Sequence, residues 1–231
     1  MTITFITGAN KGLGYETARR LIEIGQTVLV GARDPERGQT AADQLGARFV
    51  PIDVAQDESV ARAAEDIEAH EGRIDVLINN AGILGSHLPA EELAGPDAGE
   101  ILDTNVAGIV RVTHAFLPLL ERSPNPVVVN VSSGMGSFAV TTDPERLESQ
   151  VVGLGYPASK SAVTMLTSQY AKALPEMRVN CVDPGYTATD FNGHSGHKTV
   201  EQGADVIVKM ALLDASGPTG TYVDDEGTVP W

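Results

Sequence analysis

The sequence predicts an α/β fold: a single doubly wound domain with a mostly parallel seven-stranded sheet and helices on both faces. Short apolar runs alternate with amphipathic stretches from the first residues onward, which is the pattern of βαβ units. With 231 residues, 42% of them hydrophobic, the chain is long enough to bury a sizeable core as one domain. No internal repeat, low-complexity tract or linker divides it. We therefore expect one domain over residues 1–231.

Seven strands are expected where short apolar runs rich in β-branched residues are bounded by turn-forming residues. These runs are Thr2–Thr7, Gln26–Ala32, Arg48–Val54, Ile74–Asn80, Pro126–Ser132, Arg178–Asp183 and Gly220–Asp224.

Six helices are expected between these strands. The clearest pattern is that of Val60, Ala63, Ala64 and Ile67, which repeat at i, i+3, i+4 and i+7 and so form one apolar helix face. The expected helices are Gly14–Ile24, Glu36–Leu45, Glu58–His70, Asp97–Leu120, Tyr156–Leu174 and Val200–Leu213.

Composition restricts the classes of partner. The net charge of -15 opposes binding to DNA, RNA or an anionic membrane, because all three present negative surfaces. No run approaches the length of a membrane span, and the opening residues lack the basic region of a signal peptide, so a soluble cytoplasmic protein is expected. Cys181 lies in an expected strand, as a small buried residue without a chemical role. No metal site is expected, because the histidines form no metal-binding pattern; they are His70, His87, His114, His194 and His197.

A glycine-rich turn joins the first expected strand to the first expected helix. In Thr7-Gly8-Ala9-Asn10-Lys11-Gly12-Leu13-Gly14, glycines stand where the backbone must turn tightly and approach a pyrophosphate over a helix N-terminus. The spacing Gly-x-x-x-Gly-x-Gly differs from the standard Gly-x-Gly-x-x-Gly, and taken alone such a turn is equally compatible with a structural role. In its strand–helix context it predicts a dinucleotide-binding, Rossmann-type domain. The expected cradle is Gly8, Asn10, Lys11, Gly12, Leu13 and Gly14.

Charge at the end of the second strand bears on the choice between NADP and NAD. A carboxylate there would hydrogen-bond a ribose 2′-hydroxyl and repel a 2′-phosphate, while an arginine would do the reverse. The strand ends in Ala32-Arg33-Asp34, and the glycine turn carries Lys11. We expect Arg33 and Lys11, with Arg37 as a further candidate, to bind the 2′-phosphate of NADP(H). The alternative is that all three are ordinary solvated side chains and that Asp34 selects NAD(H).

Tyr156 and Lys160 stand four residues apart, which places them on one face of a helix. A phenol with a pKa of about 10 is a poor acid–base catalyst at neutral pH unless its anion is stabilised. An ammonium about 4 Å away at an effective dielectric near 20 contributes up to ~4 kcal/mol, or roughly 3 pK units, before screening. The lysine is therefore expected to bring the tyrosine into range. Taken alone, a Tyr-x-x-x-Lys pattern is more often a surface pair.

A second hydroxyl is expected at the carboxyl end of a central strand, where it would hold a substrate oxygen. The run Val127–Val131 is followed by Ser132 and Ser133. Strand ends are often serine-rich for turn reasons alone, so the position carries this prediction. Ser132 remains an alternative to Ser133.

These motifs, in this order, resemble the short-chain dehydrogenase/reductase family over nearly the whole chain. The matching residues are Thr7-Gly8-x-x-x-Gly12-x-Gly14, Asp53, Asn79-Asn80-Ala81-Gly82, Asn105, Ser133, Tyr156-x-x-x-Lys160 and Pro184-Gly185. The resemblance implies that Ser133 orients the carbonyl and Tyr156 exchanges the proton. It also implies that Lys160 lowers the tyrosine pKa and contacts the nicotinamide ribose. Asn105 is similar to the family asparagine that supports the lysine through a water and proton relay.

The resemblance also implies cofactor contacts. Asp53 would contact the adenine, Asn79 the adenosine region and Thr189 the carboxamide. Further contacts are implied at Val54, Ala81, Gly82, Pro184, Gly185 and Thr187. Each has a simpler alternative: Asp53 could cap a turn, Asn105 could satisfy helix backbone groups at a bend, and Thr189 could be a loop hydroxyl.

Ser133 and Tyr156 are 23 residues apart, against about a dozen in the usual family members. The added segment, 134–155, contains the charged, helix-compatible Asp143–Gln150 and resembles the carbonyl-reductase branch, as do the closing residues Gly220–Trp231. It would lie beside the helix surface used for tetramer assembly elsewhere in the family, which makes a monomer plausible and leaves the choice between monomer and homo-oligomer undecided.

Two long irregular segments, 134–155 and 187–198, are expected to form the substrate pocket, because loops of that length in a compact domain are usually functional or mobile. The residues expected on an apolar pocket wall are Met135, Phe138, Tyr186 and Phe191.

The function that the resemblance implies is transfer of a hydride between NADPH and a ketone or aldehyde, so that the partner is a small-molecule carbonyl or alcohol. The alternative is a non-catalytic NADP(H)-binding redox sensor, which would be expected to lose Tyr156 or Lys160; both are present. An isomerase, epimerase or dehydratase on a related scaffold would need a nucleotide-sugar domain after the last helix, and only 18 residues follow Leu213.

Overall fold

A seven-stranded parallel sheet forms the centre of the molecule. The computed structural model describes residues 1–86 and 88–231, so His87, one of the five histidines considered above, lies outside the described residues. The strand order is β3-β2-β1-β4-β5-β6-β7, and every pairing between these strands is parallel. The strands are β1 (Ile3–Thr7), β2 (Thr27–Ala32), β3 (Arg48–Pro51), β4 (Val76–Asn79), β5 (Val127–Val131), β6 (Arg178–Val182) and β7 (Tyr222–Val223). The predicted fold class is confirmed, and each strand lies inside its predicted run.

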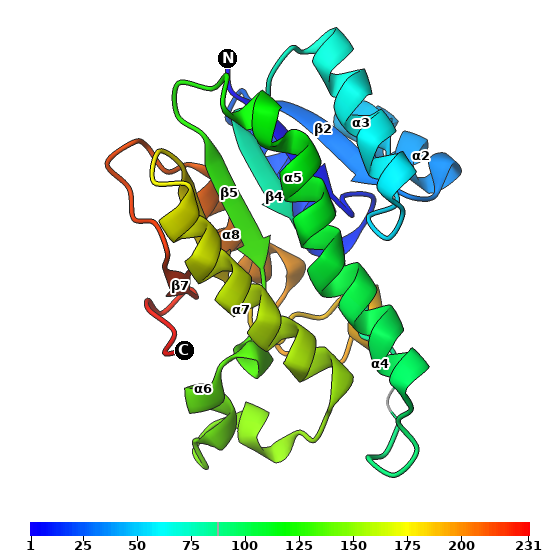
Figure 1. Cartoon of the computed structure of the whole chain (residues 1–231), viewed down its shortest axis with the longest axis vertical. Coiled ribbons are helices and arrows are strands. Elements are labelled where there is room, and N and C mark those ends of the chain that lie inside the picture. The colour runs from blue at the N-terminus through cyan, green and yellow to red at the C-terminus, as the bar shows by residue number, and fades with distance from the viewer. Residues whose placement is uncertain (87) are drawn as a thin grey trace.

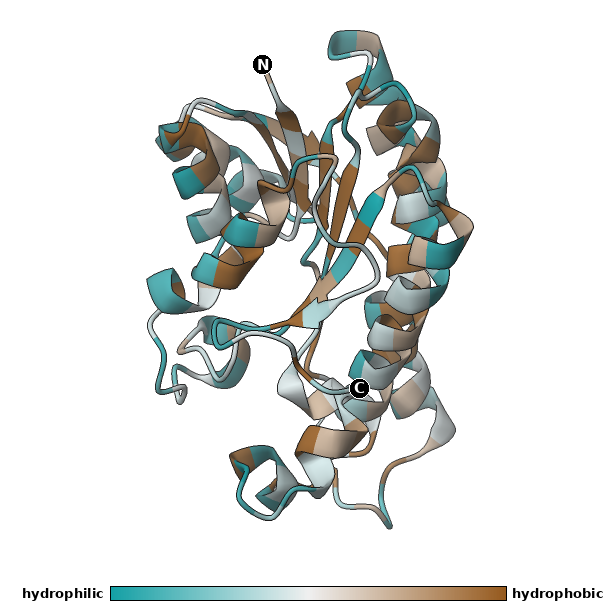
Figure 2. Cartoon of the chain, turned by 90° about the vertical axis from the view of Figure 1, so that its left-hand side faces the viewer, coloured by the Kyte–Doolittle hydropathy of each residue, from teal (hydrophilic) through white to brown (hydrophobic). Residues whose placement is uncertain are grey.

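Helices cover both faces of the sheet, as Figures 1 and 2 show. One apolar cluster joins the sheet to α1, α2 and α8, and a second joins it to α3, α5 and α7. The helices are α1 (Gly12–Glu23), α2 (Pro35–Leu45), α3 (Asp57–His70), α4 (Gly95–Leu102), α5 (Gly108–Leu120), α6 (Phe138–Thr142), α7 (Gly155–Ala173) and α8 (Val200–Ala211). Among the described residues, no helix is both long enough and apolar enough to cross a membrane.

The two apolar clusters follow from the alternation of side chains along each strand. Phe5, Leu29 and Leu77 stand at paired positions of β1, β2 and β4, and all three belong to the cluster on the α3, α5 and α7 face. The opposite cluster contains residues adjoining them in sequence, namely Ile6, Val28, Val30, Val76 and Ile78. Because both faces are covered, the central strands are continuous apolar runs rather than alternating ones.

The predicted helix Asp97–Leu120 is divided in the structure. Between α4 and α5, residues Asp103–Ala107 form a π-helical turn. Such single-turn widenings inside α-helices occur frequently at functional sites. This one contains Asn105, whose side chain is hydrogen-bonded to the backbone N–H and C=O of Ile83, at 2.8 and 2.9 Å. No proline interrupts residues 97–117, so the sequence alone shows one helix.

Segment 134–155 is more ordered than its sequence predicts. It contains a 3-10 turn at Gly134–Gly136, then α6, and a second 3-10 turn at Leu147–Gln150. The last residues of the chain fold back onto it: the main-chain oxygens of Pro230 and Trp231 accept hydrogen bonds from Ser137 Oγ at 2.5 Å and Ala139 N at 3.3 Å. Figure 1 shows this end of the chain between β7 and α6.

Candidate active site

One cavity, of about 1840 Å³, lies along the carboxyl edge of the sheet and is lined by residues that follow β1 to β6. The chain runs from β1 to β2 on one side and returns to β4 on the other. This reversal of strand order is the switch point where open α/β sheets bind their ligands. The glycine-rich turn and the Tyr156–Lys160 pair both line this cavity.

The glycine-rich turn has the backbone geometry that a pyrophosphate cradle requires. Gly8 and Gly12 have φ of 66° and 56°, in the left-handed region that favours glycine. At Gly14, a Cβ atom would lie 2.6 Å from Asn80 Nδ2 and 2.7 Å from the Gly8 oxygen. The Asn80 amide also donates to the Thr7 and Gly8 carbonyls, at 2.9 and 3.0 Å, and so fixes the turn against the end of β4.

The first turn of α1 fits an anion. Its N-cap residue, Lys11, makes no capping hydrogen bond through its side chain, so no side chain caps the first amides of the helix. Five of the six predicted cradle residues line the cavity, namely Gly8, Asn10, Lys11, Gly12 and Leu13. Gly14 lies behind them, where it permits the close contact between α1 and the turn.

Positive charge lines the cavity at the end of β2. Arg33 is exposed on its wall, and no carboxylate of the described residues forms a salt bridge with it. Asp34, the residue that would select NAD, instead caps α2: its Oδ1 accepts a hydrogen bond from Arg37 N at 3.0 Å. Arg37 is absent from the lining and lies 3.8 Å from the same carboxylate. Lys11 lines the cavity but forms a salt bridge with Asp190 at 3.1 Å.

Asn79 does not reach the cavity, contrary to the contact expected from the family resemblance. Its side chain is buried and donates to Asn130 Oδ1 at 2.8 Å and Thr113 Oγ1 at 3.3 Å. Successive side chains of a strand point to opposite faces, and here the next residue, Asn80, takes the place on the cavity wall.

Most of the other expected cofactor contacts do line the cavity. These residues are Asp53, Val54, Ala81, Gly82, Pro184, Gly185, Thr187 and Thr189. Two of them, Asp53 and Thr189, also accept hydrogen bonds from nearby backbone N–H groups, as the simpler structural alternatives predicted. Asp53 Oδ1 accepts from Ala55 N at 3.0 Å, and Thr189 Oγ1 accepts from Phe191 N at 3.3 Å. Capping a turn and facing the cavity are therefore compatible at both positions.

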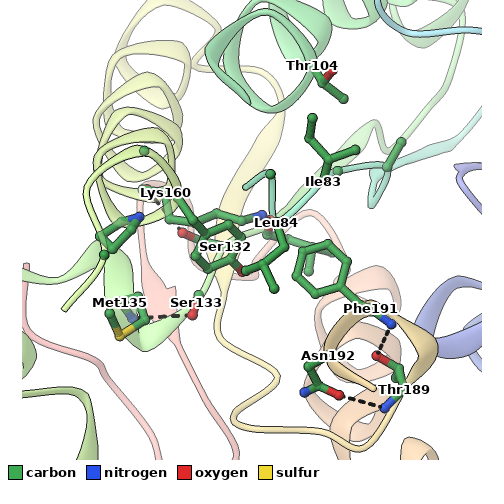
Figure 3. Close-up of a pocket in the computed structure, with 18 of the residues that line it drawn as sticks. Ile83, Leu84, Thr104, Ser132, Ser133, Met135, Lys160, Thr189, Phe191 and Asn192 are labelled. Carbon is green, nitrogen blue, oxygen red and sulfur yellow. Dashed lines mark hydrogen bonds between the residues drawn. The ribbon is translucent and has the colours of Figure 1, made fainter. Parts of the chain in front are cut away.

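Tyr156 and Lys160 share one face of α7, beside the end of β5. Lys160 is buried, and its Nζ donates to the carbonyl oxygen of Val131 at 2.8 Å. The same Nζ lies 5.5 Å from the centroid of the Tyr156 ring. The Ser133 side chain lies close enough to the Tyr156 hydroxyl to lower the pKa of that hydroxyl. Figure 3 shows Lys160, Ser133 and Met135 on one side of the pocket and Thr189, Phe191 and Asn192 on the other.

The two serines after β5 have different partners. Ser132 Oγ donates to the main-chain oxygen of Lys160 at 3.2 Å, so its proton is engaged within the wall. Ser133 Oγ accepts from Met135 N at 3.3 Å, and Ser133 lines the cavity beside Tyr156, whose pKa it lowers. The geometry therefore favours Ser133 as the hydroxyl that acts beside the tyrosine.

Burial dominates the electrostatics of this pair. It lowers the pKa of Lys160 to about 8. It also raises the pKa of Tyr156, although the neighbouring Ser133 side chain lowers that pKa and the charge of Asp183 raises it further. This is opposite to the shift expected from an adjacent ammonium. The lysine amine bonds to Val131 and lies over the aromatic ring, so its charge does not offset the burial of the phenol.

Asn105 supports the site from behind the wall. It is buried and absent from the lining, and its amide nitrogen donates to Ser159 Oγ on α7 at 3.0 Å in addition to Ile83. A Cβ atom on Gly82 would lie 3.2 Å from Asn105 Oδ1 and 3.9 Å from Lys160 Nζ. Asn105 and Lys160 thus approach each other across Gly82, and Asn105 ties the segment after β4 to the helix that carries the lysine.

The expected apolar wall is confirmed as cavity lining at Met135, Tyr186 and Phe191 but is wrong at Phe138. Phe138 begins α6 behind its cap, Ser137, and this turn leaves its side chain 74% exposed, away from the cavity. Sequence reasoning missed a larger set of apolar lining residues, namely Leu84, Leu88, Leu93, Leu147, Val151, Val152 and Leu154. The available signal was the presence of bulky apolar residues in stretches that have no helical or strand period.

The family model for short chain dehydrogenases matches residues 2–200. The chain belongs to the short-chain dehydrogenase family. This short-chain dehydrogenase is 37% identical over 241 residues to a short-chain dehydrogenase of Penicillium roqueforti, covering 98% of this chain and 95% of the relative. It is 33% identical over 277 residues to the (+)-neomenthol dehydrogenase of Arabidopsis thaliana, covering 94% of each.

Among solved structures, the NADPH-bound carbonyl reductase from chicken fatty liver matches this short-chain dehydrogenase with a TM-score of 0.88 at 25% identity, covering 100% of both chains. Together with the family match, these relatives establish an oxidoreductase that uses a nicotinamide dinucleotide and acts on small molecules.

Proposed function

We propose that this protein is an NADPH-dependent carbonyl reductase that reduces ketones or aldehydes, with Tyr156 as the proton donor. The observation that carries the proposal is that Tyr156, Ser133 and Lys160 line the same cavity as the glycine-rich turn and Arg33. A hydride donor seated on the turn and a carbonyl held by the hydroxyls would therefore meet within one site.

The residues of the site have separable roles in this proposal. NADPH, when bound, supplies the hydride. Tyr156 Oη donates a proton to the carbonyl oxygen as negative charge develops there, and its raised pKa keeps it protonated for this task at neutral pH. Ser133 Oγ donates a hydrogen bond to the same oxygen and fixes its position. Lys160, whose Nζ donates to the Val131 carbonyl, would bind the nicotinamide ribose in this proposal.

The proposed preference for NADPH rests on the charges at the end of β2. Arg33 faces the cavity, while the carboxylate of Asp34 is engaged at the start of α2. A guanidinium binds a phosphate through paired, charge-assisted hydrogen bonds. Lys11 would add a second positive charge if it left Asp190 and bound the phosphate instead. The Lys11–Asp190 ion pair is exposed to solvent, so breaking it costs little free energy.

The walls of the cavity favour an uncharged, apolar ketone as substrate. Of the fourteen large hydrophobic side chains that are exposed in the described chain, six line this one cavity; they are Leu147, Val151, Val152, Leu154, Tyr186 and Phe191. Exposed apolar side chains gathered in one place mark a binding surface. The ionisable side chains among the lining of segments 89–103 and 147–154 are acidic, namely Glu91, Glu100, Asp103 and Glu148, and these oppose an anionic substrate.

The proposal is tested by following NADPH and NADH oxidation with ketones of graded apolar size, for wild type and Tyr156→Phe. Tyr170→Phe is the matched control, because Tyr170 lies on α7 and packs in the core outside the cavity. We expect wild type and Tyr170→Phe to reduce the larger ketones with NADPH and Tyr156→Phe to lose at least about 100-fold in kcat, the range of general acid catalysis. Equal turnover by Tyr156→Phe, or cofactor binding without turnover on any carbonyl, would overturn the proposal.

A further inference from the structure

Tyr222 is a buried tyrosine that belongs neither to the cofactor cradle nor to the reacting groups. It stands on the edge strand β7 and is 1% exposed. Its hydroxyl donates a hydrogen bond to the main-chain carbonyl of Ser133, 89 residues away in the chain. A buried phenol needs a polar partner, and the partner here is the peptide that carries the proposed catalytic serine.

The strand that carries Tyr222 is firmly held. Cys181 N on the neighbouring strand β6 and Asp183 N just after it donate to the carbonyls of Thr221 and Val223, both at 2.9 Å. On the other side of Tyr222, the chain turns back and Val229 N donates to the Tyr222 carbonyl at 2.8 Å. The phenol is therefore fixed by hydrogen bonds at its own peptide and at both neighbouring residues.

The returning chain also covers the ring of Tyr222. The ring of Trp231 packs against it with centroids 5.7 Å apart. The same terminal residues accept hydrogen bonds from Ser137 and Ala139, at the beginning of α6. Residues 222–231, which we call the carboxyl-terminal hairpin, thus brace the chain on both sides of the turn that follows Ser133.

Few other contacts define the orientation of Ser133. Its carbonyl accepts from Gly136 N at 2.7 Å, and its Oγ accepts from Met135 N at 3.3 Å. Both contacts lie within the turn that Ser133 itself begins. The hydrogen bond from the Tyr222 hydroxyl ties this peptide to a part of the fold that is distant in sequence.

We propose that Tyr222 is a positioning residue, whose hydroxyl holds the Ser133 peptide so that Ser133 Oγ points at the substrate oxygen. This inference rests on the proposed function, because it assigns Ser133 the task of orienting the carbonyl. Errors well below 1 Å at such a group reduce the rate. The competing explanation is that Tyr222 only fills the core, which its aromatic ring could do without the hydroxyl.

The two explanations are separated by a double-mutant cycle. Tyr222→Phe removes one oxygen and keeps the ring, and Tyr170→Phe is the control for loss of a tyrosine hydroxyl elsewhere. We expect Tyr222→Phe to lower kcat about three- to tenfold, the value of one hydrogen bond, with the KM for NADPH unchanged. In the Ser133→Ala background the same substitution should have no further effect on kcat, because the group it positions is absent.

An equal loss of kcat from Tyr222→Phe in both backgrounds overturns the inference, and so does no loss in either. If Ser133→Ala turnover is too slow to follow, the cycle is measured on the affinity of the enzyme–NADP complex for the alcohol product, whose oxygen Ser133 would hold. If Tyr222→Phe does not fold, Trp231→Leu replaces it, since it loosens the phenol without touching the hydroxyl and should show the same coupling. A wild type that reduces no carbonyl refutes the proposed function, whereas an active wild type without coupling refutes only the role of Tyr222.

Discussion

At the scale of single residues, the site depends on a lysine held where a charge is unfavourable. Lys160 is 6% exposed, and burial lowers the pKa of its amine to about 8 from 10.5. The folded protein thus binds the Lys160 proton less tightly than the unfolded chain does, and the charged amine destabilises the fold at neutral pH.

This burial predicts a pH dependence of stability. Between about pH 8 and 10.5 the unfolded chain keeps the Lys160 proton and the folded chain does not, so stability rises with pH in this window and the gain is lost as pH falls through 8. From pH 7 to 9.5, wild type without cofactor should gain about 2 kcal/mol in unfolding free energy relative to Lys160→Met, at 1.36 kcal/mol per pK unit. Urea unfolding at both pH values measures it, and a difference independent of pH contradicts it.

Arg33 makes a second prediction at the residue scale. Arg33→Ala should raise the KM for NADPH about 10- to 100-fold and leave the KM for NADH nearly unchanged, because a charge-assisted hydrogen bond to phosphate is lost. Arg37→Ala is the matched control, since Arg37 is tied to Asp34 outside the cavity. Steady-state kinetics with both cofactors measure the change. Equal effects of the two variants, or an equal rise for NADH, would reassign the 2′-phosphate site.

At the scale of elements, two helical glycines differ in what surrounds them. A Cβ atom on Gly14 of α1 would lie within 2.9 Å of the Gly8 oxygen and the Ala9 Cα. On Gly99 of α4 it would meet no atom within 4 Å. The first helix is thus packed against the glycine-rich turn through the absence of a side chain, while the second has room for one.

These surroundings predict stability changes of opposite sign. Gly14→Ala should destabilise the fold by about 1–3 kcal/mol through overpacking and should weaken cofactor binding. Gly99→Ala should stabilise it by roughly 0.5–1 kcal/mol, because alanine favours the helix and restricts the unfolded chain. Denaturant unfolding of both variants is the measurement, and changes of the same sign would be inconsistent with the packing described.

At the scale of elements, some features could be predicted from the sequence and others could not. The strands were predictable because each is an apolar run between turn residues, and the expected cradle residues largely line the cavity because they follow such strands. The turn at Asp103–Ala107 was not predictable, since no proline marks it and its one buried side chain is the polar Asn105. Val151 and Val152 were missed because a cavity-lining loop needs no period. Whether Asn79 or Asn80 faces the cavity depends on the residue at which β4 ends. The sequence pattern does not determine that end to within one residue.

At the scale of the whole molecule, the cavity is lined by segments from both halves of the sheet. A ligand that bridges them stabilises the entire fold rather than one element. NADPH at 100 times its dissociation constant contributes about 2.7 kcal/mol, and for a chain of 231 residues this raises Tm by roughly 5–10 °C.

A thermal melt with increasing NADPH tests this prediction, and NADH at equal concentration should raise Tm less because it carries no 2′-phosphate for Arg33 to bind. In Arg33→Ala, the increases in Tm caused by NADPH and by NADH should become equal. Identical shifts in wild type would contradict the assignment of Arg33. The oligomeric state, open between monomer and homo-oligomer, stays a prediction that sedimentation of the same samples resolves.

The position of Trp231 makes the protein its own spectroscopic probe. The chain has a single tryptophan, so its fluorescence comes from one place instead of an average over several. That indole is about half exposed and packs on Tyr222. Its emission maximum and quenching by small solutes therefore report on the contact between the last residue of the carboxyl-terminal hairpin and Tyr222 on β7. A stopped-flow trace at this one fluorophore would time any movement of that contact against hydride transfer.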